Sequence, residues 1–147
     1  MIFYPKTYAE ANELAAFMLE RAYVQPTPDM KCMAWREGGK NLMVVAFNAF
    51  MGRVCQIHVA MADGFHFSPR EFLRALFHHA FVTFGVRKLL GIVNSKNTRA
   101  LRYDLHIGFV EEYRLHGLHD DGGDIVIVSM TPEQCRYLEK PCESIRA

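Results

Sequence analysis

A single histidine lies inside an otherwise apolar run, Arg53 to Ala62. Alternation along a strand places His58 on the same face as Gln56 and Ala60. Imidazole has an unperturbed pKa of about 6.5, so it can take up a proton in a reaction near neutral pH. We therefore expect His58 to be either a general base or an ordinary packed histidine.

Other residues able to transfer protons follow in the second half of the chain. Glu111 and Glu112 are rival bases, and on a strand they point to opposite faces. Tyr103 is a candidate proton donor within a helical pattern that Asn97 can cap. Each side chain also has a structural explanation, because carboxylates usually face solvent and tyrosines often pack.

A second chemical signal is a possible anion site at the start of a helix. The segment Ser68-Pro69-Arg70-Glu71 has the pattern of a helix start, with Ser68 as the cap. Free N–H groups and the helix dipole at such an end attract phosphate, and Arg70 adds a positive charge.

The histidines do not form a metal-binding pattern. No CxxC or HExxH spacing occurs, and the adjacent His78 and His79 diverge on a helix. The remaining candidates are scattered: His106, His116, His119, Cys135 and Cys142. We expect no metal.

The composition is that of an ordinary globular protein, half hydrophobic and 22% charged over 147 residues. We expect a single domain over residues 1–147. A net charge of +1 argues against nucleic acid and anionic membranes as partners. The cysteine spacing and the absence of a signal-peptide pattern favour a reduced, cytoplasmic protein.

Hydrophobic periodicity predicts a mixed α/β fold. An amphipathic helix follows a capping box at Thr7 and Glu10, and three strands then form an antiparallel meander. A helix, an apolar strand, a second helix and two strands give a central strand-helix-strand crossover and a carboxyl-terminal hairpin. The expected strands are 32–36, 41–50, 53–62, 86–93, 109–118 and 124–130, and the expected helices are 7–25, 68–85, 97–107 and a short one from 131. Strand 86–93 is expected to be buried on both faces.

This order of elements, together with one motif, resembles the GNAT N-acetyltransferases. That family commonly has an Asn after the crossover strand, a small residue three positions on, and Gly-Phe about eleven positions after the Asn. Asn97, Ala100 and Gly108-Phe109 have this spacing. The resemblance covers roughly residues 7–138. The carboxyl-terminal part, from Gly108 to Met130, is similar to a subgroup common among bacteriophage and prophage genes.

The resemblance implies that acetyl-CoA is the acyl donor. It assigns the oxyanion donor and pantetheine contacts to the backbone at Val59, Ala60 and Met61. The other implied contacts with the donor come from Gly64, Ser68, Arg70, Asn97 and Tyr103.

Two positions depart from the family pattern. Of the phosphate-loop glycines only Gly64 is present, and Asp63 stands where a basic or amide residue is expected. Many members have a Tyr seven residues after the Asn, where it protonates the leaving thiolate. Asp104 holds that position here, and Tyr103 is one residue earlier, about 100° away around a helix.

The implied function is acetyl-CoA-dependent transfer of an acetyl group to a primary amine of a protein or small molecule. The alternative is a GNAT-fold binding or structural protein of a phage or prophage with weak or no catalysis. A gap between the strands ending near Met61 and Val93 favours the enzyme, and a closed gap favours the binding protein. Exposed edge strands near the carboxyl terminus would permit homodimerisation.

Overall fold

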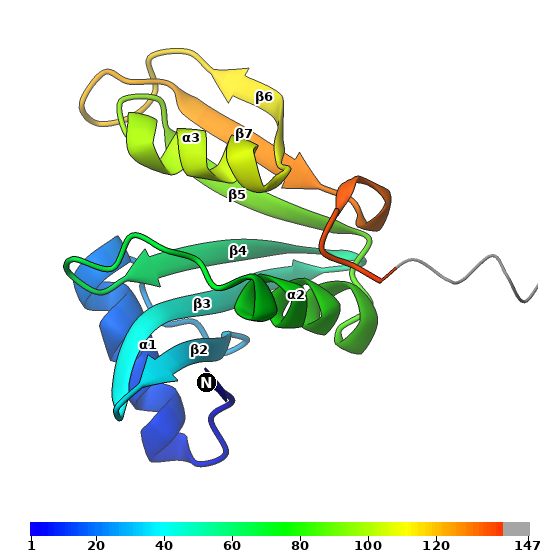
Figure 1. The fold of residues 1–147 in the computed structure, drawn as a ribbon. Coiled ribbons are helices and arrows are strands. Elements are labelled where there is room, and N and C mark those ends of the chain that lie inside the picture. The colour runs from blue at the N-terminus through cyan, green and yellow to red at the C-terminus, as the bar shows by residue number, and fades with distance from the viewer. Residues whose placement is uncertain (140–147) are drawn as a thin grey trace, which may run out of the picture.

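The computed structural model describes residues 1–139. Within them, seven strands form one mixed sheet in the order β1-β2-β3-β4-β5-β7-β6, with helices on both faces (Figure 1). The predicted order of elements is confirmed, and a two-residue strand, β1, is added at the amino terminus. The elements are β1 Ile2–Phe3, α1 Tyr8–Ala22, β2 Lys31–Glu37, β3 Lys40–Met51, β4 Val54–Met61, α2 Arg70–His78, β5 Lys88–Asn94, α3 Thr98–Ile107, β6 Val110–Leu115, β7 Ile125–Met130 and a 3₁₀ turn Pro132–Gln134.

The amino-terminal half is the predicted meander covered by α1. Thr7 and Glu10 form both bonds of the capping box, and the helix ends at Tyr23 in the left-handed conformation. Leu14 and Met18 are fully buried and pack with small residues of β2, β3 and β4. The α1 helix thus covers one face of strands β2 to β4.

Helices α2 and α3 cover the opposite face. The apolar residues predicted for α2, including Phe72, Leu76 and Phe77, are buried in the larger core. This helix continues as a π-helical turn, His79–Thr83. Gly108 ends α3 at a φ of 116°, a conformation that favours glycine. None of the helices in residues 1–139 is long and apolar enough to cross a membrane.

Two local predictions were wrong. Ser68 does not cap α2, because Pro69 is the cap residue and no side chain bonds the free N–H groups there. Strand β5 is not buried on both faces, since Ile92 is 53% exposed. The second error has a tertiary cause: α1 packs on β2, β3 and β4, and leaves the same face of β5 without a helix.

The sheet splits in its centre, between β4 and β5. These parallel strands pair only from Val54 to Gln56 on β4 and from Lys88 to Leu90 on β5. Strand β4 continues to Met61 and β5 to Asn94, and these ends have no pairing with each other. Figure 1 shows β4 and β5 diverging toward their carboxyl-terminal ends. The gap predicted from the family resemblance is therefore present.

Candidate active site

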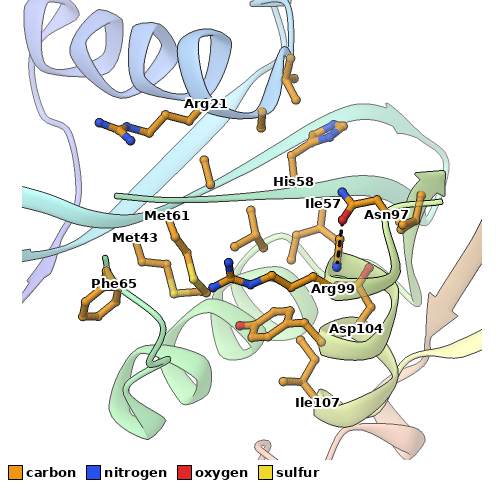
Figure 2. A pocket seen from close by; sticks show the side chains of 18 of the residues that line it. Arg21, Met43, Ile57, His58, Met61, Phe65, Asn97, Arg99, Asp104 and Ile107 are labelled. Carbon is orange, nitrogen blue, oxygen red and sulfur yellow. Dashed lines mark hydrogen bonds between the residues drawn. The ribbon is translucent and has the colours of Figure 1, made fainter. Parts of the chain in front are cut away.

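A cleft of about 660 Å³ lies where β4 and β5 separate. Arg21 and Tyr23 border it from the end of α1, and Leu73 and Tyr103 border it from α2 and α3. These helices lie on opposite faces of the sheet, so the cleft passes through the split from one face to the other. Figure 2 shows side chains that line it.

The peptide groups of Val59 and Met61 point into this gap. Alternate residues of an antiparallel strand direct their peptide groups to the partner strand. The N–H of Ala62 donates to the C=O of Leu42 in β3 at 2.9 Å. Ala60 lies two positions before Ala62, so its peptide groups point toward β3 as well. Ala60 therefore faces β3, while Val59 and Met61 face the open side of β4. Of the three residues predicted to contact the donor through the backbone, Val59 and Met61 thus lie with their peptide groups on the edge of β4 that has no paired strand within residues 1–139.

The carboxylate of Asp63, at the mouth of the cleft, is paired with Arg21. Its Oδ1 lies 3.0 Å from Nη1 of Arg21, although the Asp63 side chain is 98% exposed. The Nε of Arg21 is shielded from solvent and has no hydrogen-bond partner within residues 1–139. Asp63 stands where the family has a basic or amide residue, and the ion pair with Arg21 partly neutralises the negative charge that Asp63 adds.

Two further nitrogen donors line the same mouth. Arg99 extends from α3 into the cleft (Figure 2), and its guanidinium is hydrogen-bonded to the ring of His66. Gly64 also lines the cleft, with a φ of 77°. Guanidinium and imidazole N–H groups are suitable partners for phosphate oxygens. Arg70, which we expected to supply this charge, is exposed and does not line the cleft.

His58 borders the cleft on the face that α1 covers. It lies two positions after Gln56, the last residue of β4 that pairs with β5, at the point where these two strands separate. Its Nε2 lies 2.8 Å from Oδ1 of Asn48 in β3. Burial lowers the pKa of His58 below its usual 6.5, so the ring is neutral at pH 7. A neutral imidazole in a cleft is able to accept a proton.

Tyr103 lines the cleft from α3, but its hydroxyl is engaged. It lies 2.7 Å from the hydroxyl of Ser68 in the loop before α2. Burial raises the pKa of Tyr103 to about 12. The Ser68 hydroxyl thus joins two walls of the cleft instead of capping a helix.

Asp104, the next residue, lines the cleft beside β5 and has no side-chain hydrogen bond within residues 1–139. Burial raises its pKa from 3.8 to about 7. Its carboxyl lies over Gly91: a Cβ built there would be 3.9 Å from Oδ2 of Asp104 and 2.9 Å from Val128. Asp104 is therefore about half protonated near pH 7, in contrast to an exposed carboxyl, which is fully ionised there.

Glu111 and Glu112 do not line the cleft. An oxygen of Glu111 lies 2.6 Å from Arg114, and an oxygen of Glu112 lies 2.8 Å from Lys88. Both carboxylates therefore have ion-pair partners on the strands, away from the gap.

Asn97 caps α3 as predicted, with its Oδ1 accepting from the N–H of Ala100 at 3.2 Å, and it also lines the cleft (Figure 2). The scattered histidines and Cys135 do not gather: no group of three metal-binding side chains occurs in residues 1–139. Cys142 lies outside the described residues.

Arg99 and Asn48 were missed as site residues. Arg99 sits two positions after Asn97, but nothing in a helical pattern tells which way it extends. The sequence does single out Asn48, because it is the polar residue that interrupts the apolar run 42–51.

Solved structures of acetyltransferases are similar to this fold. Spermidine N-acetyltransferase SpeG from Vibrio cholerae, in complex with CoA and spermine, aligns with a TM-score of 0.68 at 12% identity, over 91% of this chain and 96% of that one. Mutant forms of SpeG align with a TM-score of 0.70 at 12% identity, over 90% and 94%. A T. thermophilus protein assigned as an acetyltransferase aligns with a TM-score of 0.62 at 22% identity, over 74% of this chain.

The chain spans 62% of the length of the T. thermophilus protein and 60% of a second acetyltransferase structure. No protein-family model and no curated protein matches the sequence. The structural similarity defines the fold as that of the GNAT N-acetyltransferases.

Proposed function

We propose that the protein is an N-acetyltransferase that uses acetyl-CoA to acetylate a primary amine. The observation that carries this proposal is the split between β4 and β5, where Val59 and Met61 present unpaired peptide groups to a cleft. An extended chain with amide groups can pair with such an edge as an added strand. The pantetheine arm of CoA is a chain of this kind, and SpeG, which shares the fold, is solved with CoA.

The mouth of the cleft suits the phosphate groups of the donor. Arg99 and His66 line this mouth and supply N–H donors there. Gly64 permits a close approach of the loop. Pairing with Arg21 reduces the repulsion that Asp63 would otherwise exert.

Acetyl-CoA supplies a thioester carbonyl carbon that an amine nitrogen can attack. The N–H of Val59 donates to the carbonyl oxygen as negative charge develops on it. His58 takes the proton that the amine nitrogen loses. Asp104 donates its proton to the sulfur as the C–S bond breaks, so the thiol leaves in neutral form.

Asp104 is preferred to Tyr103 as the proton donor because the Tyr103 hydroxyl is held by Ser68. His58 is preferred to Glu111 as the base because Glu111 is paired with Arg114 outside the cleft. Tyr103 and Glu111 remain the rivals for these roles.

The acceptor amine enters from the face that carries His58. The groups assigned to the donor phosphates, Arg99 and His66, lie on the side of α2 and α3, which leaves the His58 side to the acceptor. The acceptor is an amine of a protein or of a small molecule. SpeG is solved with spermine, and of the carboxylates in residues 1–139 only Asp63 and Asp104 line the cleft.

Calorimetric titration with acetyl-CoA tests the proposal. We expect saturable binding in the micromolar range, followed by release of free thiol when a suitable amine is added. No heat of binding at millimolar acetyl-CoA would refute the enzyme proposal. That result would favour the alternative, a GNAT-fold binding protein of a phage or prophage.

A further inference from the structure

Asn48 is a buried polar residue in the middle of an apolar strand. Its side chain is 7% exposed, and only Ser129 shares this combination of burial and polarity within residues 1–139. Burying an amide is costly unless its groups are hydrogen-bonded. The Oδ1 of Asn48 lies 2.8 Å from Nε2 of His58, and its Nδ2 lies 3.3 Å from Oγ1 of Thr27. The amide therefore links the His58 ring to the segment between α1 and β2.

A charge at the far end of this chain of hydrogen bonds sets its direction. The hydroxyl of Thr27 donates to Oδ1 of Asp29 at 2.8 Å, and this bond lowers the pKa of Asp29, which is ionised at pH 7. A carboxylate only accepts hydrogen bonds, so the Thr27 proton is committed to Asp29. The Thr27 oxygen must then accept from the NH₂ group of Asn48. The amide oxygen of Asn48 is left facing His58, whose Nε2 must carry the proton.

The backbone beside Asn48 is held in an unusual conformation by the same carboxylate. Ala49 has a φ of 52°, in the left-handed region that residues other than glycine rarely adopt, and the β3–β4 register shifts between Asn48 and Met51. The second oxygen of Asp29 accepts from the N–H of Phe50 at 3.0 Å. A bulge with a strained residue re-aims neighbouring side chains and often lies beside a functional site.

We propose that Asn48, with Thr27 and Asp29, positions His58 by holding its ring in the Nε2–H form, so that Nδ1 is the atom that accepts the proton. This inference rests on the proposed function of His58 as the base. The amine proton moves to Nδ1, and the ring becomes an imidazolium whose Nε2–H still donates to Asn48. When the proton leaves to solvent, the starting form returns without rearrangement of the chain. Asn48, Thr27 and Asp29 are positioning residues and do not touch the substrates.

Nitrogen-detected NMR of the His58 ring tests the inference on the full chain without any ligand. We expect Nε2 to be protonated and Nδ1 to be unprotonated above the pKa of His58. Thr27→Val removes the acceptor of the Asn48 NH₂ group, so the amide can turn and the Nδ1–H form of His58 should increase. Thr27→Ser keeps the hydroxyl and should match the wild type. Thr27 is exposed, so both variants are expected to fold.

Thr83→Val is the matched control, because Thr83 is also exposed and lies at the end of the π-helical turn. A wild-type ring protonated on Nδ1 would overturn the inference. So would an equal ratio of the two ring forms in Thr27→Val and the wild type.

Kinetics separate this inference from the proposed function. Asn48→Ala should lower kcat about tenfold or more and change the KM for acetyl-CoA less than about twofold, because the base loses its orientation while the donor site is intact. If acetyl-CoA does not bind at all, the proposed function fails, and the NMR comparison still decides whether the ring is held. If the wild type is active and Thr27→Val leaves the ring form unchanged, the positioning role fails and the proposed function stands.

Discussion

The hydroxyl oxygens of Ser68 and Tyr103 lie 2.7 Å apart and join the loop before α2 to helix α3. Both partners were predicted to do something else, Ser68 to cap a helix and Tyr103 to donate a proton. The bond ties together two walls of the cleft in which we place the acetyl donor. We expect this bond to hold the loop before α2 in place beside helix α3.

Removing either hydroxyl should loosen this connection without stopping the chemistry. Tyr103→Phe and Ser68→Ala should each lower the free energy of unfolding by about 1 kcal/mol, the usual contribution of a hydrogen bond. Each should raise the KM for acetyl-CoA a few-fold while kcat stays within about threefold. The double variant should lower the free energy of unfolding by less than the sum of the two single effects, because both substitutions remove the same hydrogen bond.

Steady-state kinetics and urea unfolding of the three variants measure these effects. A fall in kcat of about a hundredfold in Tyr103→Phe, with Ser68→Ala unaffected, would make Tyr103 the proton donor in place of Asp104.

The stability of the protein should depend on the ionisation of Asp104. Its pKa is raised from 3.8 to about 7 on folding, so the folded state keeps a proton that the unfolded state releases above about pH 4. The free energy of unfolding therefore falls as pH rises from about 4 to 7. Asp104→Asn removes the ionisation, and the variant should exceed the wild type in stability at pH 8 by about 1 to 3 kcal/mol.

Urea unfolding at pH 4 and pH 8 measures this difference, which should nearly vanish at the lower pH. Asp120→Asn is the control, since Asp120 is an exposed carboxylate on the connection between β6 and β7. An equal gain in stability at both pH values in Asp104→Asn would contradict the assigned burial of the carboxyl.

The rate of transfer should fall at high pH because Asp104 loses the proton that it donates. The descending limb of kcat/KM against pH should have a midpoint near 7. Asp104→Asn should lower kcat about a hundredfold and remove this limb. A variant that keeps both the limb and the wild-type rate would show that another group, or solvent, protonates the thiol.

Arg99 should contribute to binding the phosphate groups of the donor. Arg99→Gln should raise the Kd for acetyl-CoA about tenfold, equivalent to about 1.4 kcal/mol, because a cleft-lining guanidinium is lost. Arg70→Gln is the matched control: it removes the same charge from the first turn of α2, outside the cleft, and should change the Kd less than about twofold. Titration calorimetry at two salt concentrations measures both, and a larger effect for Arg70 would reverse the assignment.

Much of the scaffold was predictable from local pattern. The capping box at Thr7, the cap at Asn97 and the turn at Gly38-Gly39 each depend on a few neighbouring residues, and all three lie where the sequence places them. The candidate site was predictable in part. His58 and the Val59–Met61 strand end line the cleft, whereas Ser68 and Arg70 do not. Local rules failed at Ser68 because a distant hydroxyl, that of Tyr103, competed for its side chain.

The amino-acid sequence by itself determined the order of helices and strands and the strand-helix-strand crossover, because periodicity and caps act between residues a few positions apart. The tertiary structure alone decided which distant side chains meet, as in the pairs Arg21 with Asp63 and Asn48 with His58. It also decided the burial of Asp104, since the pKa of a carboxyl depends on what surrounds it in space. Such contacts join separate elements of the fold, and no local spacing in the chain encodes them.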